Sequence, residues 1–255
     1  MRDRLILGCV AALLGLVPLT AAQSQEERAA ARKVVEARSD AVVMVLATIR
    51  IRANVGGQEQ TADQQAQANG TILDASGLTV LSLSSLEPDE AMTRQLSARM
   101  RPGTRVDVSS EPSAIRMRLA DGREIPSRLV LRDPDLDLAF IRPVAATSPL
   151  TWIDAPIGRP SLLDLLFVIQ RTSERSGWST AATFGTVQLV VERPRRYYQM
   201  AAAGLGGTPL GSPVFDAAGR FVGLIVMRNS GGRGASSTGV LPAEEILEVA
   251  KQAVE

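Results

Sequence analysis

Short apolar segments separated by turn motifs run along most of this chain, and they constrain its fold more than any other feature. Between Ile115 and Leu119, apolar residues alternate with arginines, which is the period-two pattern of a strand with one buried face. Turn sequences occur at Asp74–Gly77 and Asp121–Gly122, where a hairpin needs them. Many short strands joined in this way favour antiparallel sheets closed into barrels over a parallel sheet with crossover helices.

The expected strands form two groups on either side of a linker at Pro143–Pro149. The first group comprises Ala41–Ile51, Gly70–Leu73, Leu78–Leu83, Ile115–Leu119, Ile125–Leu131 and Leu138–Ile141. The second comprises Leu162–Ile169, Thr183–Val191, Val214–Phe215, Phe221–Met227 and Thr238–Leu241. We expect helices at Glu26–Arg38, Glu87–Met100 and Pro242–Val254, and a loop in the polar, Gln-rich segment Asn54–Asn69.

The N-terminus has the three-part layout of a secretory signal peptide. Arg2 and Arg4 precede an apolar run at Leu5–Leu19, and small residues follow at Thr20–Ala22. The run is short of the roughly 20 apolar residues that span a bilayer, although an uncleaved membrane anchor is the alternative. We therefore expect residues 1–22 to be removed and the chain to be exported, to the periplasm or the cell exterior. The only cysteine, Cys9, lies inside the run, so the mature chain has no disulfide.

The absence of histidine excludes several kinds of active site. A Ser-His-Asp triad, a Cys-His dyad and a His-ligated zinc site all need an imidazole. The only lysines, Lys33 and Lys251, fall in the two expected terminal helices, which argues against a Ser-Lys dyad. The hydrophobic content of 45% and charged content of 22% are those of an ordinary globular protein rather than a disordered one.

The charge balance gives no electrostatic reason to expect a nucleic-acid partner. The chain has 28 Lys+Arg and 27 Asp+Glu residues, and removal of Arg2, Asp3 and Arg4 with the signal leaves 26 of each. The segment Arg193–Tyr198 mixes cations with aromatic residues, as nucleic-acid sites do. In an exported, neutral protein we interpret it instead as a solvated strand end or a partner patch.

One acidic pattern suggests calcium but does not complete the motif. Asp133, Asp135 and Asp137 have the alternate spacing of a calcium-binding loop. The sixth position is Leu138, where such a loop needs Gly, and the twelfth is Val144, where it needs Glu. We therefore expect no metal and no cofactor.

Several segments resemble the trypsin-like serine proteases of the bacterial HtrA (DegP-like) type, in order and in spacing. They are Val34–Val43, Gly70–Leu81, Arg118–Glu124, Arg132–Ala139, Gly211–Leu224 and Gly239–Leu241 with Pro242 and the helix beyond. The resemblance implies a mainly all-β fold of two antiparallel six-stranded barrels, with the active site in the cleft between them. The implied division is residues 1–22 as signal peptide, 23–39 as a helical segment, 40–149 as the first barrel, and 150–255 as the second barrel with a C-terminal helix. No PDZ-type module is expected after it.

The resemblance also places the family's catalytic triad on this sequence. The histidine position falls at Ser84, the aspartate at Asp137 and the nucleophile at Leu210. We expect Ser84 to be a surface hydroxyl and Asp137 to cap or bridge local backbone. The family's Gly-Asn-Ser-Gly-Gly-Pro becomes Thr208–Pro213, with a vestigial oxyanion loop formed by Thr208, Pro209, Leu210, Gly211 and Ser212.

These replacements lead to three functional hypotheses. Acyl transfer needs a nucleophile and a base, and neither Leu210 nor Ser84 supplies them. The first hypothesis is an exported pseudoprotease that binds a peptide or partner protein without cutting it. The second is an active serine endopeptidase with a rearranged site, for which Ser212 or Ser84 would be the nucleophile. The third is a structural accessory subunit of an envelope complex, and any membrane contact would run through an uncleaved signal.

Overall fold

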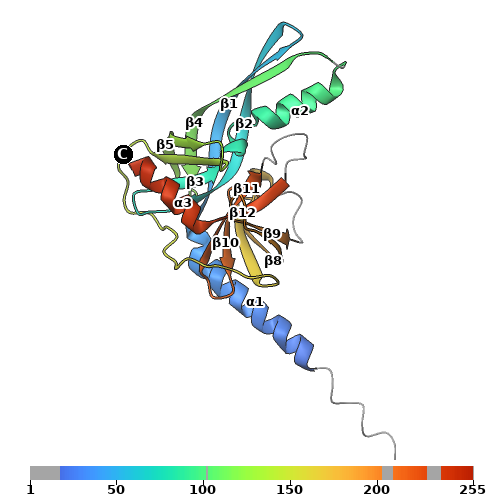
Figure 1. Ribbon diagram of the computed structural model, residues 1–255. Coiled ribbons are helices and arrows are strands. Elements are labelled where there is room, and N and C mark those ends of the chain that lie inside the picture. Colours follow the sequence, from blue (N-terminus) through green and yellow to red (C-terminus); the bar gives the residue numbers. More distant parts are fainter. Residues whose placement is uncertain (1–17, 102, 203–208, 229–236, 255) are drawn as a thin grey trace, which may run out of the picture.

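The computed structural model describes residues 18–101, 103–202, 209–228 and 237–254, and these form two closed β-barrels (Figure 1). The first barrel has the strand order β1-β2-β3-β6-β5-β4, and the second has the order β10-β11-β12-β9-β8-β7. Neighbouring strands in both barrels are antiparallel. The fold class expected from the sequence is therefore confirmed.

The first barrel and its attachments lie before residue 144. Its strands are β1 (Val42–Val55), β2 (Gln58–Ile72), β3 (Thr79–Ser82), β4 (Val106–Arg118), β5 (Glu124–Asp133) and β6 (Leu138–Pro143). A long helix, α1 (Pro18–Arg38), and a short turn of helix, η1 (Ser39–Ala41), precede it. Two helical segments, η2 (Leu83–Ser85) and α2 (Asp89–Arg99), connect β3 to β4.

The second barrel follows after the linker. Its strands are β7 (Leu165–Arg171), β8 (Thr180–Val191), β9 (Tyr197–Ala202), β10 (Pro213–Asp216), β11 (Phe221–Arg228) and β12 (Ser237–Pro242), with η3 (Glu174–Ser176) between β7 and β8. The chain continues as α3 (Ala243–Ala250) and η4 (Lys251–Val254), and η4 returns to lie against β5 of the first barrel.

Strand periodicity explains how each barrel is filled and how the two are joined. Adjacent residues on a strand face opposite sides, so Val43 points into the first barrel while Val42 joins the core between the barrels. In the same way Leu166 fills the second barrel and Phe167 faces the shared core. The fully buried Ile246 of α3 belongs to that shared core, so the terminal helix fastens both barrels together.

The helix α1 joins the body through its C-terminal half, where Val34 is buried in the shared core with Ala31 and Val35 packed beside it. Figure 1 shows the other end of α1 extending away from the barrels. No helix among the described residues is long and apolar enough to cross a membrane. Most of the expected signal peptide, residues 1–17, lies outside the described residues.

Three expectations about local structure are wrong. The polar segment Asn54–Asn69, expected as a loop, forms the hairpin turn and most of β2, and β4 begins at Val106 rather than near Ile115. These strands were missed because most of their side chains are exposed or only half-buried, so little alternation in hydropathy marks them. The strand β9 was also missed: Tyr197 and Tyr198, expected at a solvated end, are both buried.

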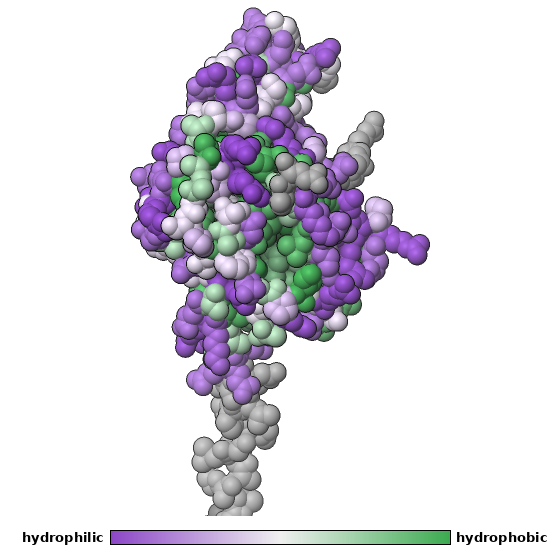
Figure 2. All heavy atoms as spheres, turned by 90° about the vertical axis from the view of Figure 1, so that its left-hand side faces the viewer, coloured by the Kyte–Doolittle hydropathy of each residue, from purple (hydrophilic) through white to green (hydrophobic). Residues whose placement is uncertain are grey.

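Beyond the barrel proper, β1, β2 and β4 continue as a long three-stranded extension with α2 beside it (Figure 1). We call residues 48–67 and 104–113 the arm. Figure 2 shows that the upper part of the molecule, where the arm lies, is mostly hydrophilic, whereas apolar side chains gather in the middle of the body. The arm is thus an addition whose outer surface resembles solvent-exposed sheet rather than core.

Candidate functional site

Asp137 lies in the turn between β5 and β6 and is almost completely buried, with 6% of its surface exposed. The side chain of Asp133 forms this turn by accepting a hydrogen bond from the backbone N–H of Leu136. Asp137 then adopts a left-handed backbone conformation, with φ of 58°, which aspartate tolerates better than most residues. Its carbonyl oxygen accepts a hydrogen bond from the backbone N–H of Leu83, which fixes the turn against η2.

The carboxylate of Asp137 accepts four hydrogen bonds. Oδ1 accepts from the backbone N–H and the hydroxyl of Ser84, each at 2.7 Å. Oδ2 accepts from the hydroxyl of Ser82 and, at 2.7 Å, from the backbone N–H of Met227. An ionised carboxylate offers about four acceptor positions, so all of them are occupied. Asp137 therefore bridges local backbone, and through Met227 it also bridges the two barrels.

Ser84, expected as a surface hydroxyl, is half-buried, and its hydroxyl donates to Oδ1 of Asp137. The residue lies in η2, directly after the buried strand β3. The structure thus brings two of the three transferred triad positions, Ser84 and Asp137, into direct contact.

Leu210 is half-buried and packs against the core of the second barrel. The next residue, Gly211, donates its N–H to the carbonyl of Ile225 at 2.8 Å and accepts from the hydroxyl of Thr71 at 3.3 Å. A methyl group on Gly211 would lie 2.1 Å from the carbonyl oxygen of Asn69. It would also lie 3.3 Å from the backbone nitrogen of Ser82. The segment that carries Leu210 therefore lies against the strands that lead to Asp137.

The remaining residues of the expected oxyanion loop differ in accessibility. Ser212 is completely buried and its hydroxyl has no hydrogen-bond partner among the described residues. Its backbone N–H donates to the carbonyl of Pro209, and its carbonyl accepts from Ile225. Thr208 lies outside the described residues. A buried serine without a neighbouring base has neither the exposure nor the activation that a nucleophile needs.

Comparison with known proteins assigns the fold to a family. The family model of the trypsin-like peptidase domain matches residues 19–224. The chain belongs to this family.

Solved structures that resemble this trypsin-like domain include HtrA-type proteases. The protease AlgW with a tripeptide superposes with a TM-score of 0.56 at 19% identity, over 88% of this chain and 64% of that one. A variant form of AlgW with a decapeptide gives a TM-score of 0.56 at 18% identity, over 88% of this chain and 66% of that one. The chain thus spans less than two thirds of the length of these structures. No match was found among curated proteins.

Arg171 ties the two barrels of the trypsin-like domain together at a second place. Its guanidinium donates to the carbonyl oxygens of Ser39 at 2.8 Å and Val42 at 2.9 Å, and to the hydroxyl of Thr180 at 2.6 Å. Its backbone N–H donates to the side chain of Asn69 at 2.6 Å. Burial lowers the pKa of Arg171 from the ordinary arginine value, and the nearby Asp40 opposes that shift.

Sequence reasoning missed the partners that hold Asp137. Ser82 lay within an expected strand but carried no signal of its role, and the Met227 contact is made by a backbone N–H, which no side-chain pattern marks. Within the described parts of the trypsin-like domain, no group of three or more acidic or cysteine side chains is placed to hold a metal ion. The site is therefore a hydrogen-bonded junction of Ser82, Ser84 and Asp137, and Gly211, which follows Leu210 in the chain, lies close to Ser82.

Proposed function

We propose that this trypsin-like domain is an exported pseudoprotease, which binds a peptide or partner protein without hydrolysing it. The observation that carries the proposal is the environment of Asp137, whose carboxylate is fully occupied by Ser82, Ser84 and Met227. In a serine protease triad the aspartate orients an imidazole. Here serine donors take that place, and the chain contains no histidine.

The chemistry of peptide hydrolysis lacks its two essential groups under this proposal. The position transferred as nucleophile is Leu210, which has no atom that can attack a carbonyl. Ser84 cannot act as general base near neutral pH, because a hydroxyl is far too weakly basic. Loss of a single triad nucleophile or base costs on the order of a millionfold in turnover, and further losses add little.

An active endopeptidase with a rearranged site is disfavoured by the placement of the two candidate serines. The hydroxyl of Ser212 is completely buried and has no base beside it among the described residues. The hydroxyl of Ser84 donates to a carboxylate that already accepts three other hydrogen bonds. Ser84 is thus held as a donor to Asp137, and the chain has no imidazole to act between them as the general base of a serine nucleophile.

Two facts favour binding as the remaining role. The scaffold on either side of the junction is intact, with both barrels closed and joined by Asp137 and Arg171. Two of the related solved structures carry bound peptides, a tripeptide and a decapeptide. Leu210 is half-buried and precedes Gly211, which lies close to Ser82, so Leu210 would offer a peptide an apolar contact in place of a reacting group.

A binding assay with a matched control tests the proposal. An extended, casein-like polypeptide should bind the full-length protein and be recovered uncut. Leu210→Gln should weaken that binding at least fivefold, whereas Leu189→Gln, at an exposed leucine on the same barrel, should leave it unchanged. Equal effects of the two variants, or recovery of cleaved polypeptide, would contradict the proposal.

A structural accessory subunit is the second candidate, and exposed apolar side chains on the second barrel favour it. Leu162 and Leu163 are 59% and 78% exposed, and Phe184 is 54% exposed. Phe184 also borders a pocket of about 220 Å³ that Glu27, Arg28 and Ala31 of α1 line from the other side. A partner bound to this outer face would not need the cleft between the barrels. Copurification of the protein with its partner complex should then be lost in Leu163→Glu and kept in Leu210→Gln.

A further inference from the structure

The arm has one open sheet edge, formed by β2. The strands β1 and β2 pair without interruption from Val42↔Thr71 to Val55↔Gln58. On its other side β2 pairs with β3 only at Thr71 and Ile72. The carbonyl of Asn69 faces Gly211, so the second barrel covers that part of the edge. On the side away from β1, the stretch from Gln58 to Gln67 pairs with no strand among the described residues, and nearly all of its side chains are exposed.

The other edge of the arm, formed by β4, is protected. β4 pairs with β5 only at Arg116–Arg118, so its earlier residues also form an edge. That edge contains Pro112, which has no N–H to donate, and Ala114 with a positive φ of 47° at the irregular part of the strand. The helix α2 lies beside it (Figure 1). Prolines, bulges and covering helices are the usual devices that prevent edge pairing.

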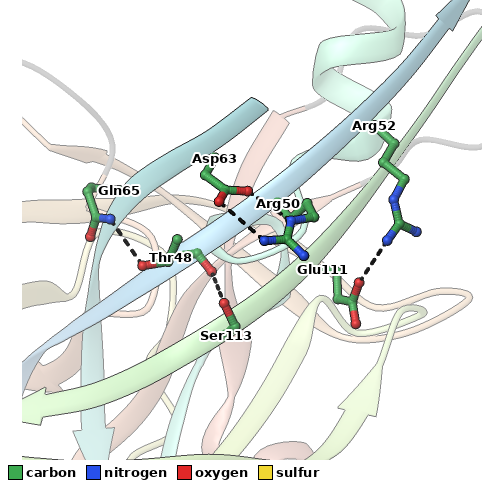
Figure 3. Close-up of polar contacts among 7 residues, drawn as sticks. All are labelled: Thr48, Arg50, Arg52, Asp63, Gln65, Glu111 and Ser113. Carbon is green, nitrogen blue, oxygen red and sulfur yellow. Dashed lines mark hydrogen bonds and ion pairs between the residues drawn. The ribbon is translucent and has the colours of Figure 1, made fainter. Parts of the chain in front are cut away.

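The β2 edge has none of these devices. It contains no proline, lysine or arginine between Gln58 and Gly70, and its register with β1 has no bulge. Its acidic residues are Glu59 and Asp63, and Asp63 is already paired with Arg50, whose guanidinium donates to both carboxylate oxygens at 3.0 and 3.3 Å (Figure 3). Little net charge therefore opposes the approach of another strand.

Side-chain contacts across the arm tie its three strands together. Gln65 donates to the hydroxyl of Thr48 at 3.0 Å, and Arg52 pairs with Glu111 of β4 at 3.4 Å. Figure 3 shows these contacts and the Arg50–Asp63 pair bridging neighbouring strands. An edge strand without a bulge presents its outward N–H and C=O groups in a regular row.

We propose that the β2 edge pairs with the β2 edge of a second copy of this chain, antiparallel and about a twofold axis at Ala62. In a two-residue hairpin the residues flanking the turn bond to each other, so every second residue from Glu59 onward directs its backbone groups outward. A second copy of this chain carries the same row of unpaired N–H and C=O groups. When the two β2 edges run antiparallel, each row pairs with the other in a closed, self-complementary contact.

The charges on the edge select the register. A twofold axis at Asp63 would place two aspartates opposite each other, and one at Thr61 would place Glu59 opposite Asp63. An axis at Ala62 places Asp63 opposite Thr61 and Glu59 opposite Gln65, which is free of like-charge pairs. This register forms about eight backbone hydrogen bonds over a narrow contact, so the dimer should be weak and dependent on concentration.

The proposal is tested by blocking the edge without touching the β1 ladder. Thr61→Pro removes one outward N–H, and Thr61→Val at the same site keeps it. Native mass spectrometry and sedimentation over a range of concentrations should show that Thr61→Pro raises the dissociation constant of the dimer at least tenfold and that Thr61→Val does not. Equal masses for the full-length protein and Thr61→Pro at every concentration would overturn the proposal.

Site-directed crosslinking tests the register. In a Cys9→Ser background, Ala62→Cys should form a disulfide-linked dimer on mild oxidation, because the two side chains face each other at the axis. Ser109→Cys, at an exposed position on β4, should remain monomeric. Crosslinking of Ser109→Cys alone, or a monomer whose β2 edge binds only an extended peptide, would contradict self-pairing.

Discussion

The carboxylate of Asp137 accepts a hydrogen bond from the backbone N–H of Met227, at an N–O distance of 2.7 Å, and so joins the first barrel to the second. The same side chain holds Ser82 and Ser84. Asp137, which the resemblance assigns to the position of the triad aspartate, is here a buried link between the two barrels.

Replacing Asp137 by Asn should therefore destabilise the protein. The asparagine amide keeps one acceptor oxygen. Its NH₂ group would replace the other oxygen and would face N–H and O–H donors, which could then no longer bond to it. We expect a loss of about 2–4 kcal/mol in the free energy of unfolding, measured by urea denaturation. Asp135→Asn, at an exposed position in the same turn, should change it by less than about 0.5 kcal/mol. Equal losses in the two variants would show that the Asp137 contacts do not stabilise the fold.

A methyl group on Gly211 tests how closely the Leu210 segment approaches the first barrel. Gly211 and Gly103 both have a positive φ, of 80° and 88°. Only at Gly211 would the added carbon collide with backbone, whereas nothing lies within 4 Å at Gly103. Gly211→Ala should cost more than about 3 kcal/mol of stability and Gly103→Ala about 1 kcal/mol. If thermal and urea unfolding gave similar losses of stability for Gly211→Ala and Gly103→Ala, the close approach of Gly211 to the first barrel would be contradicted.

The Arg50–Asp63 pair on the arm should give a measurable pH dependence. Hydrogen bonding and charge from Arg50 lower the pKa of Asp63 below its usual value. A lowered folded-state pKa adds stability that is fully present above the unfolded-state pKa and is lost as the pH falls through the folded-state value. NMR titration should show that Asp63 ionises at a lower pH than an ordinary aspartate, and that Arg50→Gln returns its pKa to the ordinary range. An unchanged titration in Arg50→Gln would show that the pair does not form in solution.

Restoring two triad positions tests the transfer of residues from the family. Ser84 already contacts Asp137, so Ser84→His would begin from the position of the missing base. The double variant Ser84→His with Leu210→Ser should react slowly with a fluorophosphonate probe, while each single variant should stay unlabelled, because the groups act as a unit. Labelling of either single variant, or none in a folded double variant, would show that these positions do not form a triad.

The two barrels could be predicted from the sequence because turn motifs separate their strands and many of the strands have one buried, apolar face. The alternation of Ile115 and Met117 with arginines, and the Asp121–Gly122 turn, correspond to the paired strands β4 and β5. Ser84 and Asp137, the positions taken from the family pattern, lie in direct contact. In these places the structure favoured by the local sequence is the one that the whole fold requires.

The parts that sequence did not predict are held by other forces. The outer part of β2 is a strand because β1 supplies a hydrogen-bonding edge and Gly56–Gly57 turns the chain, and its own side chains are polar on both faces. The partner of Asp137 on the second barrel is a backbone N–H, which any residue except proline would supply at position 227. Neither the outer part of β2 nor the Met227 contact is therefore marked by a pattern of residue types in the sequence.

The most direct test of the central claim is the rate at which the purified protein hydrolyses an unfolded, casein-like substrate, with the Leu210→Gln variant as a background control. The account predicts that both proteins cleave no faster than buffer and that a fluorophosphonate probe labels neither. Hydrolysis by the unmodified protein well above that background, abolished by Ser84→Ala or Ser212→Ala, would contradict it.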